Sequence, residues 1–165
     1  MAIDVTEDDG VTTVTIDRPD VKNALDHETM SELADELREI SESDARAVVL
    51  QGAGGTFCAG ADVNALVNFA HTSPPEIVEI IENDLHEIVR QLFRMRKPTV
   101  AKVRGHAVGA GCNLALACDL TVAEESATFA ELFTQIGLSQ DSGSSYIPPR
   151  PVGMKNAKEI VFTGT

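Results

Sequence analysis

The residues best suited to chemistry lie in two glycine-rich turns, each between a strand-like run and a short apolar helix. One turn opens the segment Gly105 to Asp119, and the other runs from Gly52 to Gly60. A tight turn into a helix leaves backbone N–H groups without acceptors, and such groups attract negative charge. An enzyme can aim them at an oxygen that becomes negative during reaction. Two such turns in one small chain predict an oxyanion hole made of two backbone amides.

Composition limits the partners and the location. The 165 residues are enough for one domain, residues 1–165, with a hydrophobic core. A formal net charge of −13 argues against nucleic acid, because phosphates bind basic surfaces. No apolar run reaches the roughly 18 residues of a membrane span, and no secretory signal is visible. The three cysteines lack metal-ligand spacing, so we expect no metal site. Together these features predict a cytoplasmic protein.

Hydrophobic periodicity predicts strands that alternate with helices. A turn at Asp8-Asp9-Gly10 should join the first two strands, and Asn23 or Asp26 should cap the first helix. The expected strands are 3–7, 11–16, 47–50, 98–103, 120–123 and 128–130. The expected helices are 24–40, 74–95, 111–117 and 155–162, with a further helix starting at residue 62. This order indicates an α/β fold with right-handed crossovers.

Three segments resemble the crotonase, or enoyl-CoA hydratase/isomerase, superfamily. They are Asn23-Ala24-Leu25-Asp26, the run Thr56 to Val63 (Thr-Phe-Cys-Ala-Gly-Ala-Asp-Val), and Gly105 to Asp119. They occur in the family's order and cover most of the chain. The resemblance implies a crotonase-like spiral of ββα units that binds an acyl-CoA thioester and stabilises its enolate. It also implies assembly into trimers or hexamers.

The same resemblance assigns residues to the site. The oxyanion donors would be the backbone N–H groups of Ala61 and Ala110. The expected contacts to coenzyme A, which arrives as part of the substrate rather than as a separate cofactor, are Lys22, Ala24, Ala59 and Asp62. Because an acidic protein needs local positive charge to bind an anionic thioester, Lys22 and Arg18 are the candidates to meet its phosphates.

The family's hydratases use two glutamates to orient a water and move its proton. The matching positions here are Asn113 and Phe133, and neither side chain can do that work. Glu131 lies two residues before the second position and is the carboxyl that a hydratase reading requires. Hydration through Glu131 is therefore one alternative.

The preferred alternative is isomerisation, with Asp141 as the residue that transfers the proton. Asp141 lies in Ile136-Gly137-Leu138-Ser139-Gln140-Asp141-Ser142-Gly143, which resembles a segment of several enoyl-CoA isomerases, where one aspartate moves a proton between carbons. Apolar neighbours would raise the pKa of such a carboxyl, and Phe133, Ile136, Leu138 and Ile147 are candidates. The alternative is that Asp141 only caps a helix starting near Gly143. A related dehalogenase uses its aspartate as a nucleophile, but it relies on tryptophan, which this chain lacks.

The family resemblance also places helices beyond the last residue of this chain. Those helices normally cover the acyl pocket and build the trimer, so we expect the chain to represent the crotonase core without them. Apolar surface should then be exposed, which favours association into a homo-oligomer. The rival to an isomerase is a shortened, non-catalytic protein that only binds a CoA thioester.

Overall fold

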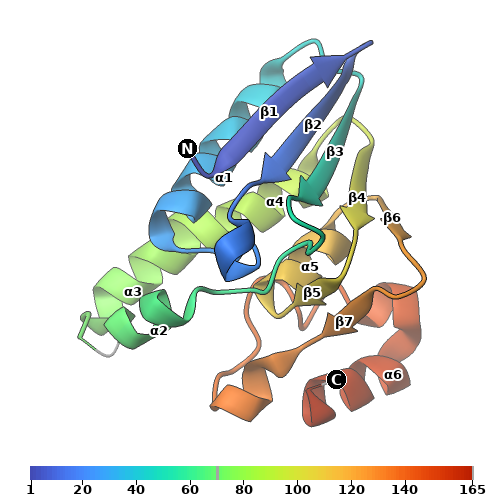
Figure 1. Cartoon of the computed structure of the whole chain (residues 1–165). Helices are drawn as coiled ribbons and strands as arrows, with labels where there is room; N and C mark the ends of the chain where they lie inside the picture. The colour runs from blue at the N-terminus through green and yellow to red at the C-terminus, as the bar shows by residue number, and fades with distance from the viewer. Residues whose placement is uncertain (70, 165) are drawn as a thin grey trace.

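The computed structural model describes residues 1–69 and 71–164, so Ala70 and Thr165 of the predicted domain lie outside the described residues. The strands are β1 Ile3–Asp8, β2 Val11–Ile16, β3 Ala47–Gly52, β4 Thr99–Val103, β5 His106–Val108, β6 Leu120–Ala123 and β7 Thr128–Ala130. The helices are α1 His27–Glu42, α2 Val63–Phe69, α3 Pro74–Ile80, α4 His86–Arg94, α5 Ala110–Ala117 and α6 Pro149–Thr163. A five-stranded sheet, in the order β1-β2-β3-β4-β6, stands above the pair β5–β7 (Figure 1).

The sheet begins with the predicted hairpin. β1 and β2 pair antiparallel, with Ile3 opposite Ile16, and Asp9 and Gly10 make the turn with positive φ angles of 44° and 75°. Two positive φ angles match the right-handed twist of the flanking strands, and Asp-Gly adopts them readily. The other pairs, β2–β3, β3–β4 and β4–β6, are parallel, as the predicted crossovers require.

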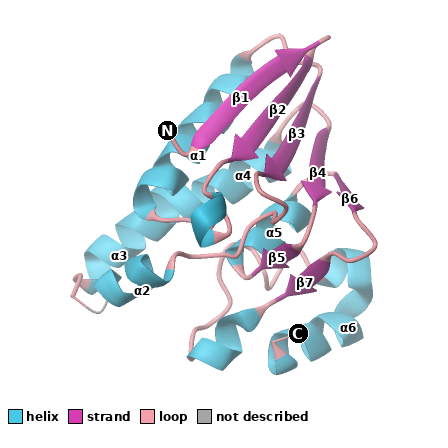
Figure 2. Ribbon diagram, in the orientation of Figure 1, coloured by secondary structure: helices cyan, strands magenta, loops and turns pink. Residues whose placement is uncertain are grey.

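One face of the sheet forms the core. Alternate residues of β2 and β3, among them Val14, Ile16, Val48 and Leu50, are buried while their neighbours are only partly covered. Helices α1 and α4 lie against that face (Figure 2). Helix α1 begins at His27 rather than residue 24, and Asp26 is its cap as predicted, because the Asp26 carboxylate accepts a hydrogen bond from the Thr29 amide at 2.9 Å.

The long helix predicted for 74–95 is interrupted by π-helical geometry. α3 and α4 flank a π-helical turn, Ile81–Leu85, in one continuous run. π turns insert an extra residue and rotate the following helix face. The buried residues of the run therefore cluster at its C-terminal half, where Leu85, Ile88 and Leu92 pack, while Ile80 is only partly buried.

Two elements differ from the prediction. β5 lies inside what the sequence indicates as a turn, since its three residues are too few to show periodicity. α6 begins at Pro149 rather than near residue 155, because proline is tolerated in the first turn of a helix. A kink at Gly153, with φ of 79°, separates that first turn from the regular helix.

Apolar side chains are exposed on the last elements of the chain. Leu120 and Val122 on β6 are each 60% exposed, and Phe162 on α6 is 73% exposed. This agrees with the expected apolar surface, whereas the predicted association into an oligomer stays a prediction. No helix within residues 1–69 or 71–164 combines the length and apolar character of a bilayer span.

The start of β4 depends on a reciprocal hydrogen-bond pair. The Asp119 carboxylate accepts from the Thr99 amide at 2.8 Å and from its hydroxyl at 3.0 Å, and that hydroxyl accepts from the Asp119 amide at 2.8 Å. Thr99 is 1% exposed. The pair ties β4 to the loop that leaves α5, and so holds α5 against the sheet.

We predict that Thr99→Val lowers the free energy of unfolding by about 1–3 kcal/mol, because it leaves the Asp119 amide without its acceptor. Urea unfolding followed by circular dichroism measures the change. Thr6→Val, on the exposed surface of β1, is the control and should change stability little. Equal stability of Thr99→Val and wild type would contradict this role for Thr99.

Candidate active site

The two glycine-rich turns run side by side. The Cys58 amide donates to the His106 carbonyl and the Val108 amide donates to the Cys58 carbonyl, both at 3.0 Å. This is a parallel bridge between the loop after β3 and strand β5. The contact also requires glycine at position 111 of α5, because a Cβ there would lie 2.3 Å from the Cys58 carbonyl oxygen. The pairing places Ala61 at the end of one turn and Ala110 at the end of the other.

The direction of the Ala61 amide follows from its own bridge. The Leu25 amide donates to the Gly60 carbonyl, and the Asp62 amide donates to the Leu25 carbonyl, both at 2.8 Å. Ala61 lies between Gly60 and Asp62, the two residues that bond to Leu25. In a parallel bridge such a middle residue points its own N–H away from the partner strand. The Ala61 N–H thus faces away from Leu25, and Ala61 is exposed.

The Ala110 amide opens α5. Gly109 caps the helix with φ of 53° and ψ of −121°, a conformation that favours glycine, and Ala110 is the first helical residue. A Cβ placed on Gly60 would lie 3.6 Å from the Ala110 nitrogen, so the two turns meet here. Among residues 1–69 and 71–164, neither the Ala61 nor the Ala110 amide has a hydrogen-bond acceptor. The structure therefore brings two free donors close together.

Asp141 is half-buried, and its negative charge acts on Glu131, which follows the Ala130 carbonyl that accepts the Gly109 amide. Burial raises the pKa of its carboxyl, while a hydrogen bond from the Ser142 hydroxyl, at 2.6 Å, and the charge of His86 oppose that shift. Its side chain accepts no backbone amide within the described chain, so it does not cap a helix as the alternative required. Of the apolar neighbours predicted, Phe133 and Ile147 are buried, whereas Ile136 and Leu138 are 57% and 44% exposed.

Glu131 is fully buried. Burial, with a smaller contribution from the negative charge of Asp141, raises the pKa of its carboxyl to about 7. The Cys112 thiol and the Asn113 amide lie near enough to lower this pKa in part, but neither completes a hydrogen bond, and both carboxyl oxygens lack a partner. Around neutral pH the side chain is therefore poised between a neutral acid and a carboxylate.

The two family glutamate positions, Asn113 and Phe133, are both buried and supply no acid. Asn113 is fully buried one helical turn after Ala110, and Phe133 is 6% exposed. A Cβ on Gly109 would lie 4.0 Å from the Phe133 ring. The arrangement thus offers Asp141 as the half-buried carboxyl and Glu131 as a fully enclosed one.

The predicted coenzyme A contacts gather around the loop 18–26. Lys22 is exposed in a left-handed conformation, with φ of 55°, and its carbonyl accepts the Ala59 amide at 3.1 Å. Ala24 is 7% exposed, and its carbonyl accepts a hydrogen bond from the Arg18 guanidinium. The structure thus brings Lys22, Ala24 and Ala59 together on one surface.

Arg18 is occupied by acids. Its guanidinium lies 2.7 Å from the Asp26 carboxylate and 3.3 Å from that of Asp62. Asp62 is buried and also accepts the Asn64 amide at 2.9 Å at the start of α2. Since two carboxylates already compensate its charge, Arg18 is a poor candidate for a phosphate, and Lys22 is left as the cation at this loop.

His86 is a neighbour of Asp141 that sequence analysis did not assign to the site. Its charge is close enough to Asp141 to lower the pKa of that carboxyl, and its Nδ1 lies 3.1 Å from a Glu82 oxygen. The π-helical turn directly before it, which no sequence pattern shows, sets the direction of its side chain. In the part of the chain that the structure describes, no three His, Cys, Asp or Glu side chains are grouped as metal ligands.

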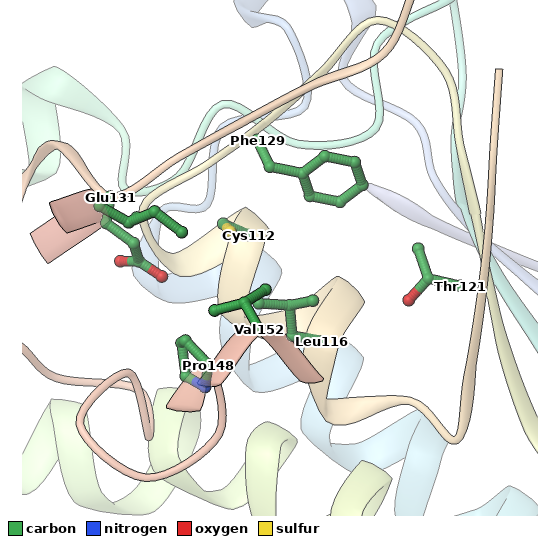
Figure 3. Close-up of a pocket in the computed structure, with 8 residues that line it drawn as sticks. Cys112, Leu116, Thr121, Phe129, Glu131, Pro148 and Val152 are labelled. Carbon is green, nitrogen blue, oxygen red and sulfur yellow. The ribbon is translucent and has the colours of Figure 1, made fainter. Parts of the chain in front are cut away.

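A cavity of about 240 Å³ lies between α5 and α6 (Figure 3). Its lining is mostly apolar and consists of Cys112, Leu116, Thr121, Phe129, Glu131, Pro148, Val152 and Ile160. Figure 3 shows Cys112 and Leu116 on α5, with Pro148 and Val152 across from them. Glu131 thus stands between this cavity and the polar side chains near Asp141.

Glu131→Gln should remove a pH dependence of stability. The folded chain holds the Glu131 proton up to about pH 7, whereas the unfolded chain releases it near 4.5. The stability from this group is therefore complete below pH 4.5 and is lost as pH rises through 7. Relative to wild type, the variant should gain on the order of 3 kcal/mol between pH 4.5 and 8. Urea unfolding across that range measures it.

The control is Glu159→Gln on the exposed side of α6. Its stability should follow wild type at every pH. If Glu131→Gln also runs parallel to wild type from pH 4.5 to 8, the carboxyl is not held protonated.

Comparisons with known proteins agree with this geometry. The family model described as enoyl-CoA hydratase/isomerase matches residues 6–165. The 1,2-epoxyphenylacetyl-CoA isomerase of Escherichia coli K12 is 36% identical over 157 residues, which cover 94% of this chain and 60% of the relative. The 4-chlorobenzoyl coenzyme A dehalogenase-1 of an Arthrobacter species is 34% identical over 162 residues, 98% of this chain and 59% of the relative.

Solved structures show the same fold. An enoyl-CoA hydratase from Polaromonas sp. JS666 superposes with a TM-score of 0.93 at 32% identity, and the match covers all of this chain and 64% of that one. The chain thus spans about 60% of the length of the relatives it matches. With matching sequence motifs and a matching fold, this chain belongs to the enoyl-CoA hydratase/isomerase, or crotonase, family.

Proposed function

We propose that this protein binds an acyl-CoA thioester and moves a carbon–carbon double bond within its acyl group. The observation that supports this best is the pair of free amides at Ala61 and Ala110, on two turns that meet, with the half-buried Asp141 carboxyl as the candidate acid and base. The amides of Ala61 and Ala110 would hold the thioester oxygen, and Asp141 would be the acid and base. No separate cofactor takes part, since coenzyme A arrives with the substrate.

The proposed reaction needs one carboxyl group. Asp141, as a carboxylate, removes a proton from C2 of a 3-enoyl thioester. The C–H electrons move into the conjugated system and place negative charge on the thioester oxygen, which the two amides stabilise. Asp141, now protonated, gives the proton to C4, and the double bond lies between C2 and C3. A raised pKa suits this exchange, because the carboxyl must both accept and release the proton.

Hydration is the second candidate and depends on Glu131. Addition of water requires a group that orients the water and a group that supplies a proton to carbon. Asn113 and Phe133 cannot transfer a proton, and the Glu131 oxygens are sealed from solvent. A water would have to enter this enclosed region before Glu131 could act on it. Asp141 faces no such barrier, which favours isomerisation.

Positive charge that could bind an anionic thioester is provided at one loop, by Lys22. Lys22 would meet the phosphates at the loop that also carries Ala24 and whose Lys22 carbonyl accepts the Ala59 amide. Asp62 would act through its ion pair with Arg18 and its cap on α2. We further propose that copies of the protein assemble into a homo-oligomer, for which the exposed apolar residues of β6 and α6 provide the surface.

Asp141→Asn should abolish isomerisation. With a 3-enoyl-CoA substrate, we expect kcat to fall by about 10²–10⁴-fold, because the amide cannot accept the C2 proton. The appearance of the conjugated 2-enoyl thioester in the ultraviolet measures the reaction. Asp44→Asn, on an exposed loop, is the matched control and should retain wild-type activity.

The same assay separates the alternatives. Water addition to a 2-enoyl-CoA that persists in Asp141→Asn and disappears in Glu131→Gln would instead establish a hydratase. Chloride release from 4-chlorobenzoyl-CoA would indicate a nucleophilic aspartate. Thioester binding without any turnover would leave only the non-catalytic binder.

Ala110→Pro should isolate the contribution of one amide hydrogen. Proline is well tolerated at the first position of a helix, so α5 should persist while its first N–H is lost. We expect kcat to fall by about 10²–10³-fold with a small change in melting temperature. Ala110→Gly keeps the N–H and is the control. Comparable activity of the two variants would contradict an oxyanion role for this amide.

A further inference from the structure

The loop that follows Asp141 lies along one face of α4. A Cβ placed on Gly143 would lie 3.5 Å from Cγ1 of Val89. Further along both segments, the rings of Tyr146 and Phe93 meet edge to face, with their centroids 5.8 Å apart. Val89 and Phe93 are four residues apart, so they point from the same side of the helix. The loop thus follows α4 in a fixed register.

The same register places His86 beside Asp141. His86 lies one helical turn before Val89, on the side that faces the loop, and its Nδ1 lies 3.1 Å from a Glu82 oxygen. Burial raises the pKa of the Asp141 carboxyl, and the charge of His86 is among the influences that oppose this rise. The Glu131 carboxyl, from the segment after β7, also interacts electrostatically with Asp141. The rotation of α4 about its axis therefore decides how much positive charge Asp141 meets.

The π-helical turn directly before His86 sets that rotation. The His86 amide donates to the carbonyl of Ile81, five residues earlier, where an α-helix would use the carbonyl four residues earlier. Such turns are rare, because regular α geometry is the default, so a tertiary contact has to hold this one. Only two residues of the turn are buried, the core residue Leu85 and the charged residue Asp84.

Asp84 connects the π turn to the start of α1. It is 7% exposed, and its Oδ2 lies 2.6 Å from Nδ1 of His27, the first residue of α1. In the part of the chain that the structure describes, no hydrogen-bond donor reaches this oxygen from elsewhere. The ionisable side chains that share an open cavity with this pair are His71, Glu76 and Glu79. Because a buried carboxylate requires a partner, the contact with His27 fixes Asp84 and the turn that carries it.

We propose that Asp84 is a positioning residue for Asp141. Its contact with His27 holds the π turn in place, and the turn directs His86 toward the loop. This inference rests on the proposed function, since it concerns the acid and base assigned there. When the contact is broken, the helix is free to return to regular α geometry, which turns His86 by about 100° around the axis and away from the loop.

NMR titration of the aspartate carboxyl carbons tests the proposal on the whole chain. The Asp141 signal is the one missing from Asp141→Asn. Asp84→Asn should raise the pKa of Asp141 above its wild-type value, because His86 no longer opposes the effect of burial. His27→Gln breaks the same contact from its exposed side and should have the same effect. Glu79→Gln removes a charge from the same cavity and is the matched control, so it should leave the Asp141 titration unchanged.

The pH profile of isomerisation gives a second readout. With its pKa raised, less of the Asp141 carboxyl is ionised under acidic conditions. At about pH 5, kcat/KM of Asp84→Asn should therefore fall by about 3–10-fold. At about pH 8, where the carboxyl is ionised in both proteins, the two values should agree within about twofold. An equal loss at both pH values would show a merely structural role and would overturn the inference.

A double variant tests whether the contact acts through His86. His86→Gln alone should raise the pKa of Asp141, and adding Asp84→Asn should raise it no further. The inference is overturned by a further rise in the double variant, or by an unchanged Asp141 titration in any of the single variants Asp84→Asn, His27→Gln and His86→Gln. Absence of turnover with every enoyl-CoA contradicts the proposed function instead, and the carboxyl titration still decides the inference.

Discussion

The site depends on the parallel pairing of two chain segments outside the main sheet. The hydrogen bonds between Cys58 and strand β5 align the end of one glycine turn with the end of the other, and Gly111 lets α5 approach the Cys58 carbonyl. Each turn alone would present one amide to solvent. Only their shared register brings the donors at Ala61 and Ala110 together, so the proposed oxyanion hole depends on tertiary pairing.

Charge is arranged so that this region can tolerate a new negative oxygen. Arg18 is paired with Asp26 and Asp62, so its guanidinium does not neutralise the acids near α5. Burial keeps the Glu131 carboxyl largely protonated below about pH 7, which limits the negative charge facing an enolate. Asp141, less enclosed and accompanied by Ser142 and His86, is the carboxyl better able to ionise there. The two carboxyl groups thus differ in how readily they ionise, because Glu131 is buried more deeply than Asp141.

Much of the fold follows from local sequence signals. The Asp9-Gly10 turn, the Asp26 cap and the alternating apolar residues of β2 were all predictable from residue types and spacing. Strand β5, the π-helical turn and the exposure of Ile136 and Leu138 were not, because each depends on distant contacts. The site was predictable as a set of segments, through the two glycine turns and the family motifs. The proximity of His86 to Asp141 was not, since it depends on how the π turn rotates α4.

The two buried asparagines, Asn23 and Asn113, differ in whether their side-chain hydrogen bonds are satisfied. Asn23 donates to two carbonyls of the loop after β3, which carries Ala61, and its oxygen accepts the Arg18 amide. Among the described residues, neither polar atom of Asn113, one turn from Ala110, has a hydrogen-bond partner. The same residue type is thus satisfied at one end of the site and unsatisfied at the other, so the lack of partners depends on the position of Asn113 and not on the residue type.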